Sequence, residues 1–375
     1  MHVCLIANQI AAWGKIGGFG TATRALGGAL AARGVRVTAV VPRLAGSGQG
    51  RRERLDGIDV RGERAWSTMA SGRVFREIAA DVYHSQEPTV ASWWAQRAVP
   101  DAVHVVTCRD PRGWRDHRIE LAYGSWRRRV RFPVTWLYEV APWVKAAVRG
   151  ADAVLCAAPF LREKVLSLYG RRASFVPSPV ALPTRDPCKS QQPLVLLVGR
   201  FDRRKRVERF FELARRCPGV RFAAIGRAHE PGYDRRLREQ AAGIRNLELP
   251  GEASRFSGTE LASWYERSWV LVNTSAREAL PYTFLEALAH GVALLAPFDP
   301  DGVVSRFGAV VRAERFEEGL EGLLFGEAWR ASGRAGAQWV RETFSEETSL
   351  TQHLDLYRRL LSTPRAERRA DERSS

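Results

Sequence analysis

The stretch VCLIANQIAAWGKIGGFGTATRALGGALAARGVRVTAVV, residues 3–41, decides the fold. It opens with the apolar run Val3–Ala7 and closes with the β-branched run Val35–Val41, and both have the length of a strand. Between them, Leu26 and Leu30 are four residues apart, which places them on one face of a helix, and a glycine ends that helix. A strand, a helix and a second strand in this order predict a βαβ unit in a parallel sheet.

The same alternation continues along the chain and predicts two domains. The 375 residues exceed the roughly 250 to 300 at which a single hydrophobic core stops growing. Further strand-like runs lie at residues 82–84, 103–108 and 153–156, and a second series lies at 194–198, 220–225, 247–249, 270–273 and 292–296. The fold class is therefore α/β, with two Rossmann-like, doubly wound parallel-sheet domains facing a cleft.

The domain boundary is expected in a segment rich in Pro, Ser, Gln and Asp that lacks apolar periodicity. We expect an N-terminal domain at residues 1–180, a linker at 181–193 and a C-terminal domain at 194–348. Residues 349–361 have apolar side chains at helical spacing, so we expect a helix that docks back on the body of the protein. Residues 362–375 contain almost no apolar side chains, which predicts a disordered tail.

The composition limits the environment and the partners of the chain. A net charge of +17 predicts attraction to nucleic acid, acidic lipid head groups or a phosphorylated substrate, although the arginines are spread over the whole chain. No apolar run in the sequence is long enough for a membrane helix, and we expect no secretory signal. The five cysteines are odd in number and form no CxxC pair. We expect a cytoplasmic protein, with peripheral contact to the inner membrane surface left open.

A glycine-rich loop follows the first strand. Gly17, Gly18 and Gly20 precede a helix that we expect to begin at Thr21. Glycines let backbone amides approach a phosphate closely, and a helix N-terminus attracts an anion. A glycine-rich turn capped by Thr21 explains these residues equally well, because the spacing is not GxGxxG.

The second domain opens with VGRFDRRK, residues 198–205. Gly199 and Arg200 leave the end of the strand, and Lys205 follows five residues after Arg200, so both cations can reach one point above the sheet. A diphosphate leaving group needs such a pair of charges. A solvated basic run is the alternative, since further arginines surround Lys205.

The sequence TSAREALPYTFLEALAHG, residues 274–291, follows a later strand. It predicts a loop that carries Glu278 and a helix that starts near Pro281 and carries Glu286. Carboxylates accept hydrogen bonds from vicinal diols such as those of a sugar or a ribose, and amides at the helix N-terminus can hold a phosphate between them. Two surface glutamates are the simpler interpretation.

In this order the segments resemble glycosyltransferase family 4. VGRFDRRK is similar to the family's GRxxxxK, REALPYTFLEALAHG to its EGFGxxxLEAxAxG, and GGFGTATRALGGALAARGVRVTAVVP to its N-terminal glycine loop and helix. DVYHSQEP resembles DVxHxHxP, and WVRETFSEETSLTQHLDLYRRLL resembles the family's helical ending. The resemblance runs over about residues 1–361.

The resemblance implies a GT-B fold and a retaining hexosyltransferase of glycan biosynthesis. The N-terminal domain would lie on the acceptor side and the C-terminal domain would bind the nucleotide sugar, with no cofactor and no metal. The implied catalytic residues are Arg200, Lys205 and Glu278. The implied donor-binding residues are Gly17, Gly18, Gly199, Leu280, Tyr282, Thr283 and Glu286. The implied partners are the donor and an anionic or carbohydrate acceptor (a glycan, a lipid-linked sugar or a small metabolite), and nucleic acid is not expected.

Several positions depart from the family pattern. Ala279 and Pro281 replace glycines, and Pro281 has no N–H to offer a donor. Arg109 stands at the acceptor-side position where the family has a histidine, and a permanently charged guanidinium cannot act as a base. Gln86 stands where a second histidine is common, and Ser178 where asparagine often occurs. His84, at the end of a strand, is either an acceptor contact or a structural histidine.

The segment Arg112–Arg149 mixes arginines with Trp114, Trp126, Trp136 and Trp143. Such a mixture favours binding to a membrane surface, an anionic acceptor or single-stranded nucleic acid, and our hypothesis is an acceptor-side patch. The alternative is aromatic packing beneath a solvated arginine face. Two rival functions remain at this point. One is a basic nucleic-acid-binding protein, which leaves the ordered motifs unexplained. The other is a catalytically silent GT-B protein that binds nucleotide sugars, motivated by Arg109, Ala279 and Pro281.

Overall fold

The structure, a computed structural model, describes residues 1–13, 17–43, 50–63, 72–124, 129–130, 132–133, 136, 140–251, 258–311, 315–365 and 367–368. The chain divides into two compact units. The first unit comprises Met1–His117, Val130–Pro179 and Glu346–Ser375, and the second comprises Arg118–Arg129 and Val180–Ser345. The C-terminal helix, which the sequence assigns to neither domain, therefore belongs to the first unit.

The first unit is built on an eight-stranded sheet with the order β3-β4-β2-β1-β5-β6-β7-β8. Its strands pair in parallel except β3, which is antiparallel to β4. The strands are β1 (His2–Ile6), β2 (Arg36–Pro42), β3 (Arg52–Leu55), β4 (Ile58–Glu63), β5 (Val82–Ser85), β6 (Val103–Cys108), β7 (Ala153–Cys156) and β8 (Ser174–Phe175). The strand order reverses between β1 and β5, which is the switch point of this sheet.

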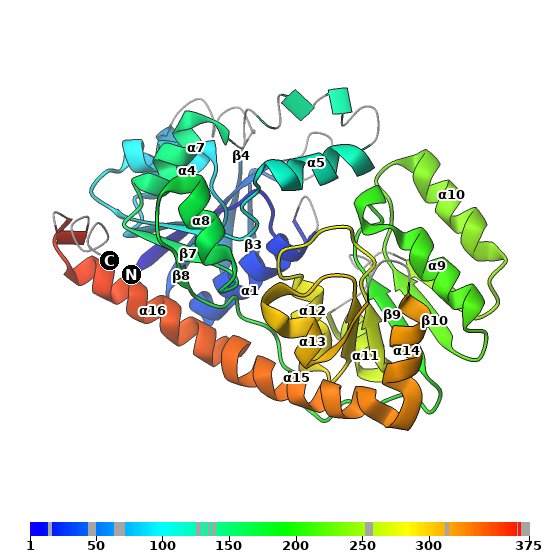
Figure 1. Cartoon of the computed structure of the whole chain (residues 1–375). Coiled ribbons are helices and arrows are strands. Elements are labelled where there is room, and N and C mark those ends of the chain that lie inside the picture. The colour runs from blue at the N-terminus through cyan, green and yellow to red at the C-terminus, as the bar shows by residue number, and fades with distance from the viewer. Residues whose placement is uncertain are drawn as a thin grey trace. The chain divides into compact units, whose positions relative to one another are not determined.

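Helices cover both faces of this sheet (Figure 1). One face packs against α1 (Gly18–Ala32) and α16 (Glu346–Ser362), which contribute Leu26, Leu30 and Leu350 to one buried cluster. The other face packs against α3 (Arg73–Ile78) and α4 (Val90–Ala98). The remaining helices that begin in this unit are α5 (Trp114–Tyr123), α7 (Pro142–Arg149) and α8 (Leu161–Tyr169). Both faces are buried because the strands are apolar on both sides, as parallel strands usually are.

The second unit is built on a six-stranded sheet with the order β11-β10-β9-β12-β13-β14. All of its strand pairs are parallel. The strands are β9 (Leu194–Val198), β10 (Arg221–Ile225), β11 (Leu247–Gly251), β12 (Val270–Val272), β13 (Ala293–Ala296) and β14 (Gly308–Val310). The strand order reverses between β9 and β12, where Val195 pairs with Val270. The expected two parallel-sheet α/β domains are confirmed.

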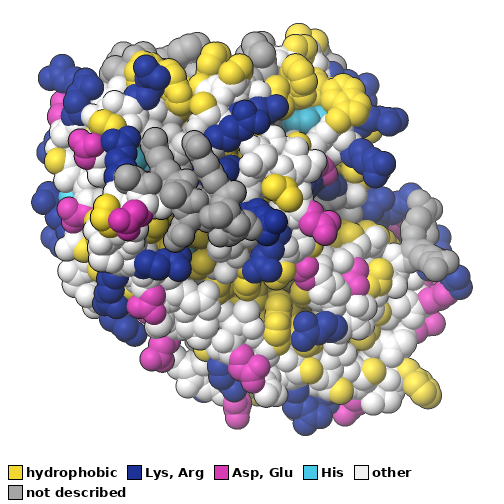
Figure 2. All heavy atoms as spheres, turned by 60° about the vertical axis from the view of Figure 1, so that its left-hand side comes forward, with side chains coloured by type: hydrophobic (Ala, Val, Ile, Leu, Met, Phe, Trp, Pro, Cys, Tyr) yellow, Lys and Arg dark blue, Asp and Glu magenta, His cyan; other side chains and the backbone are white. Residues whose placement is uncertain are grey.

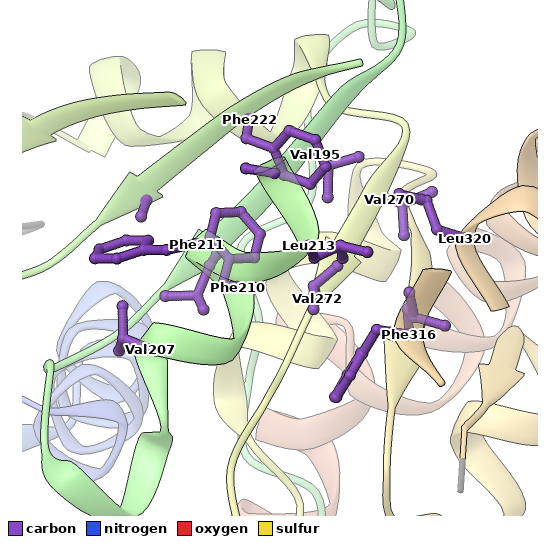
Figure 3. Close-up of a cluster of buried hydrophobic side chains, with 14 of the residues drawn as sticks. Val195, Val207, Phe210, Phe211, Leu213, Phe222, Val270, Val272, Phe316 and Leu320 are labelled. Carbon is purple, nitrogen blue, oxygen red and sulfur yellow. The ribbon is translucent and has the colours of Figure 1, made fainter. Parts of the chain in front are cut away.

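One face of the second sheet carries a large apolar core (Figure 3). Helix α9 (Val207–Arg216) turns Val207, Phe210 and Phe211 toward Val195 and Phe222 of the strands, and none of these five side chains is exposed. A fully buried Phe contributes roughly 1.5–3 kcal/mol. This packing fixes the start of α9, and therefore the short 3₁₀ turn Arg203–Lys205 that precedes it.

The structure describes further helices in the second unit. They are α10 (Pro231–Ala242), α11 (Gly258–Arg267), α12 (Tyr282–Ala289), α13 (Val303–Arg306), α14 (Phe316–Leu324) and α15 (Ala328–Phe344). Helices α9 and α10 pack against each other at one end of this unit (Figure 1). Trp269 and Trp329 stack with ring centroids 4.4 Å apart, which joins the start of β12 to α15.

Two boundaries differ from the sequence expectation. Helix α1 begins at Gly18 and not at Thr21, because Gly17 takes the N-cap position and its carbonyl accepts from the N–H groups of Gly20 and Thr21. Helix α16 begins at Glu346 and runs to Ser362. Beyond it, Arg365 pairs with Asp101 at 2.9 Å, so part of the predicted tail is placed against the first unit, while residues 366 and 369–375 lie outside the described residues.

The surface is strongly basic without being uniform. Lys and Arg side chains are spread over most of the face drawn in Figure 2, with Asp and Glu side chains among them. Within the described part of the chain, none of the helices has the length and apolar character needed to cross a membrane. Cys4, Cys108, Cys156, Cys188 and Cys217 are all free thiols.

Candidate functional site

The candidate site of the second unit lies at the carboxyl ends of β9 and β12. These two strands are neighbours at the point where the strand order reverses. In open α/β sheets this switch point is where ligands bind, because the loops of the two strands diverge there. Gly199 and Arg200 follow β9, and Glu278 lies in the loop after β12, so two motifs far apart in the sequence meet here.

Two glycines shape the loop after β9. Gly199 has φ +152°, a conformation that residues with a side chain rarely adopt. Gly226, directly after β10, lies against it, because a Cβ on Gly226 would be 2.0 Å from the carbonyl oxygen of Gly199. Gly226 lies outside the sequence motifs, although a glycine at a strand end is a signal for close backbone approach.

Hydrogen bonds tie the loop after β9 to the loop after β12. The backbone N–H of Ala276 donates to the carbonyl of Arg204 at 2.9 Å, and Thr274 Oγ1 donates to the carbonyl of Lys205 at 2.6 Å. The guanidinium of Arg206 donates to the carbonyls of Thr274, at 2.8 Å, and Ser275, at 3.2 Å. Lys205 is therefore held at a fixed position relative to the second loop.

Lys205 and Glu278 form an ion pair between these two hydrogen-bonded loops. Lys205 Nζ donates to Glu278 Oε1, and Ser275 Oγ donates to the same oxygen at 2.8 Å. Arg204 lies 3.9 Å from it. Burial opposes the charge of Glu278, but the Lys205 and Arg204 cations outweigh burial and hold the pKa of this carboxyl below its usual value. Glu278 is thus a carboxylate at neutral pH.

Arg200 has a different partner. Its guanidinium lies 3.2 Å from Asp202, and the side chain is 39% exposed. The structure therefore brings Lys205 together with Glu278, and leaves Arg200 at the exposed end of the same loop. An exposed pair of this kind contributes about 0–1 kcal/mol, so a ligand can take over the guanidinium at little cost.

Helix α12 positions the remaining residues of the second motif. Leu280 precedes Pro281, which is the N-cap of this helix. Tyr282 and Thr283 then begin its first turn. The first N–H groups of a helix have no acceptor within the helix and attract anions. Glu286 lies one turn further on, where Tyr265 donates to its Oε2 at 2.9 Å. Burial raises the pKa of Glu286 to about 7, and the bond from Tyr265 acts in the opposite direction.

In the first unit, Gly17 and Gly18 begin α1 after residues that lie outside the described part of the chain. Gly20 has a packing role, because a Cβ there would be 3.1 Å from the backbone nitrogen of Ala11. The carbonyl of Gly20 also accepts from that nitrogen at 3.0 Å. Gly20 therefore makes a close backbone contact beside the start of α1.

His84 is completely buried in the first unit. Its Nδ1 is hydrogen-bonded to the hydroxyl of Tyr357 at 2.6 Å and its Nε2 to Thr107 Oγ1 at 2.7 Å. Burial and the nearby His353 and Arg109 hold the pKa of His84 well below its usual value. Both ring nitrogens are engaged, which favours the structural interpretation of this residue over an acceptor contact.

Arg109 is hydrogen-bonded to the two other residues of the first unit, Gln86 and Ser178, that depart from the family pattern. Its guanidinium donates to Ser178 Oγ and to Gln86 Oε1, both at 2.5 Å, and the side chain is 6% exposed. The three departures are therefore not independent, because each one supplies a partner for another. The mixed basic and aromatic segment is only partly described: Trp114, Trp136 and Trp143 are exposed, whereas Trp126 lies outside the described residues.

Among the described residues, no group of three or more His, Cys, Asp or Glu side chains is arranged to hold a metal ion. The chemistry of the site in the second unit is that of fixed charges. It offers two cations, the N–H groups of a helix start, and two carboxylates whose other oxygens can accept from hydroxyl groups.

Comparison with protein families gives two matches in succession. Residues 16–182 match the model described as Glycosyltransferase Family 4, and residues 192–324 match the model described as Glycosyl transferases group 1. Together the two matches cover most of the chain. No curated protein matches the sequence.

Solved structures share the fold over nearly the whole chain. Sucrose-phosphate synthase from Thermosynechococcus elongatus is 19% identical, with a TM-score of 0.75 over 96% of this chain and 99% of that one. HepE from Anabaena in complex with UDP-glucose is 14% identical, with a TM-score of 0.68 over 94% and 98%. The pneumococcal O-GlcNAc transferase in complex with UDP and GlcNAc is 11% identical, with a TM-score of 0.65 over 96% and 99%. At these identities the likeness concerns the fold.

Proposed function

This chain belongs to glycosyltransferase family 4 and has the GT-B fold, and from that premise we propose that it is a retaining, metal-independent hexosyltransferase. It moves a sugar from a nucleoside diphosphate donor to an acceptor hydroxyl. The observation that carries the proposal is the Lys205–Glu278 pair at the carboxyl ends of β9 and β12, the switch point of the second sheet. A cation fixed at this position is suited to a departing diphosphate.

The donor is held by complementary groups of the second unit. Arg200 and Lys205 neutralise the diphosphate, and the first turn of α12 supplies N–H groups from Tyr282 and Thr283. The contacts of Glu278 with Lys205, Ser275 and Arg204 all go to Oε1. Within the described residues this leaves Oε2 to accept from a hydroxyl of the donor sugar, while Glu286 accepts from the ribose.

The pairing of Lys205 with Glu278 also prepares the site for catalysis. A free lysine side chain loses up to about 2 kcal/mol of rotamer freedom when a ligand immobilises it. Here Glu278 and the hydrogen bonds between the two loops have already restricted Lys205 before the donor arrives. The same carboxylate can then contact the sugar, so the cation and the sugar contact are set together.

In the proposed reaction the bond between the anomeric carbon and the diphosphate oxygen breaks, and a bond from the acceptor oxygen forms on the same face of the sugar. The acceptor proton passes to an oxygen of the departing diphosphate. Arg109 cannot take this proton, because a guanidinium stays charged. Lys205 and Arg200 stabilise the negative charge that develops on the leaving group, which is the largest contribution expected of this site.

The donor and the acceptor have to be identified by experiment. Two of the structural neighbours are complexes with UDP-glucose or with UDP and GlcNAc, which supports uridine nucleotides as the first donors to examine. For the acceptor, exposed Trp114, Trp136 and Trp143 support a surface on the first unit for an anionic glycan or lipid-linked sugar.

The decisive experiment measures nucleotide binding by thermal shift. Wild type and Lys205→Ala are compared with UDP, GDP, ADP, TDP and their sugar conjugates, in the presence of EDTA. A ligand at 100 times its Kd adds about 2.7 kcal/mol of stability, which raises Tm visibly. Lys164→Ala is the matched control, because Lys164 pairs with Asp116 at 2.6 Å and its side chain is 30% exposed, against 21% for Lys205.

We expect one nucleotide to stabilise wild type and Lys164→Ala in EDTA, and to fail with Lys205→Ala. Loss of the shift in EDTA would overturn metal independence alone. If the protein binds the donor but neither transfers the sugar nor slowly hydrolyses the donor, it is a catalytically silent binding protein. If no nucleotide stabilises the wild type, the glycosyltransferase proposal is wrong, and binding to DNA or RNA at physiological salt becomes the next measurement.

A further inference from the structure

Glu286 is backed by a second side chain that the sequence motif does not contain. Tyr265 lies on α11, and its hydroxyl donates to Glu286 Oε2 at 2.9 Å. The Tyr265 side chain is 2% exposed, so the phenol approaches the carboxylate from the interior of the second unit. Because this contact goes to Oε2, Oε1 remains for a ligand within the described part of the chain.

The ring of Tyr265 is itself held in place. His290, which ends α12, stacks on it with centroids 5.6 Å apart and an interplanar angle of 26°. His290 Nδ1 is also hydrogen-bonded to the backbone carbonyl of Glu286 at 2.8 Å. One histidine therefore supports the backbone of Glu286 directly and its carboxylate through Tyr265.

Lys189 closes this network from the segment before β9. Its Nζ donates to the carbonyls of Ser268 at 2.8 Å and His290 at 2.7 Å, with a longer contact to the carbonyl of Tyr265 at 3.4 Å. Three acceptors match the three N–H bonds of an ammonium group. Lys189 thus joins the end of α11 to the end of α12, which fixes the two helices that carry Tyr265 and Glu286.

The contact with Tyr265 also affects the charge of Glu286. A carboxyl group must be ionised to accept from two hydroxyls of a diol, and burial disfavours that form. A hydrogen bond from the phenol stabilises the ionised form. Tyr265 therefore orients Glu286 and also favours its charged form.

We propose that Tyr265 is a positioning residue for the donor ribose: it holds Glu286 with Oε2 occupied and Oε1 presented to the ribose hydroxyls. The inference rests on the proposed function, since it assigns Glu286 to the donor. It predicts a selective effect, because removing the phenol should weaken contacts to the nucleoside and leave those to the diphosphate intact.

The test measures Kd by calorimetry for UDP, GDP, ADP and inorganic pyrophosphate. For the ribonucleoside diphosphate that binds wild type, the affinity of Tyr265→Phe should be about tenfold lower. Its affinity for pyrophosphate, which needs only Arg200, Lys205 and the start of α12, should stay within about twofold. Glu286→Ala should give at least the same loss for the nucleotide, and Tyr265→Phe/Glu286→Ala should lose no more than Glu286→Ala alone.

Tyr233→Phe provides the matched control. Tyr233 is 3% exposed, lies on α10 of the same unit, and donates to Glu208 Oε1 at 2.8 Å. The Tyr233→Phe variant therefore loses a buried phenol–carboxylate hydrogen bond of the same kind, but one that does not involve Glu286. The Kd of this variant for the nucleotide should equal that of wild type. If Tyr265→Phe fails to fold, His290→Leu replaces it, and the same selective loss is expected.

Each outcome bears on one of the two proposals. Unchanged nucleotide affinity in Tyr265→Phe, an equal loss for pyrophosphate, or additive losses in the double variant would overturn the positioning role and leave the proposed function standing. Failure of wild type to bind any of these three nucleotides, or TDP, would overturn the proposed function and the positioning role with it.

Discussion

In the second unit, the loop after β12 places Glu278 beside Lys205, whereas in the first unit β5 places His84 in contact with Tyr357 of α16. Both sites lie beside the switch point of a doubly wound sheet. Glu278 keeps one oxygen for a ligand, while both ring nitrogens of His84 are already engaged. At the same position in the fold, the second unit therefore has a residue that can contact a ligand, whereas the first unit has a residue that holds helix α16 in place.

A polar residue at a strand end is therefore not by itself a ligand-binding site. The two sites differ in the charge and the accessibility of the groups that contact each other there. Lys205 and Glu278 are charged, partly accessible and held by loops, whereas Tyr357 and Thr107 are neutral and buried. Four experiments test this contrast between the two units.

The largest effect is expected for Lys205→Ala in the second unit. We predict that kcat for sugar transfer falls about 10²- to 10³-fold, or ~2.7–4 kcal/mol, because the leaving diphosphate loses a fixed cation. Steady-state transfer with the donor identified by thermal shift measures this. Because Lys205→Ala also leaves Glu278 without its nearest cation, Lys205→Met/Glu278→Gln should regain thermal stability without regaining activity. Full activity in either variant would contradict the assignment.

The next effect concerns the first unit and is one of stability. His84→Ala should lower the free energy of unfolding by about 3 kcal/mol, because it leaves a cavity and removes the partner of two buried hydroxyls. Urea denaturation monitored by circular dichroism measures this change. Kd for the donor nucleotide should be unchanged. A variant of normal stability that no longer transfers sugar would instead return His84 to the acceptor site.

A third prediction is acid lability of the same region. Burial lowers the pKa of His353 to about 4, and His84, Arg109 and Tyr357 are its neighbours. The unfolded histidine, with an ordinary pKa near 6.5, binds more protons than the folded one as pH falls below that value. This residue should cost about 2 kcal/mol of stability between pH 7 and pH 5. His353→Gln should flatten that part of the pH–stability curve, and an unchanged slope would refute the prediction.

The smallest effect is a pH dependence of donor binding in the second unit. Burial raises the pKa of Glu286 to about 7, and binding of a diol needs the carboxylate, so donor affinity should rise with pH. Between pH 6.5 and pH 8 we expect about a fourfold increase, or ~0.8 kcal/mol. A nucleotide sugar is the appropriate ligand, because its phosphates do not titrate in this range. Glu286→Gln should remove the dependence, and a wild-type affinity independent of pH would contradict it.

Much of the fold was accessible from local patterns. The expected runs at Val103–Cys108, Ala153–Cys156 and Leu194–Val198 are strands with these same bounds. Strands β3, β4, β8 and β14 were missed, since they are short or carry charged residues such as those of β3. Their formation depends on a neighbouring strand that supplies hydrogen-bond partners, and periodicity does not report that neighbour.

The candidate site was accessible in part for a related reason. Arg200, Lys205, Glu278 and Glu286 stand out because they follow apolar runs at strand ends. Gly226 and Tyr265 do not belong to any motif, and their roles appear only where their neighbours are known. Likewise, Gln86, Arg109 and Ser178 look like three separate departures in the sequence and form one hydrogen-bonded group in the structure.

The two parallel-sheet units and the motifs that follow β9 and β12 could be predicted from the sequence, because a strand, a helix start or a glycine turn is encoded within about ten residues. Which motif residues contact one another depends instead on the tertiary structure. Lys205 meets Glu278 across 73 positions and His84 meets Tyr357 across 273. Such contacts depend on strand order and on which helix covers which face, and the free energy that selects them is spread over the whole core.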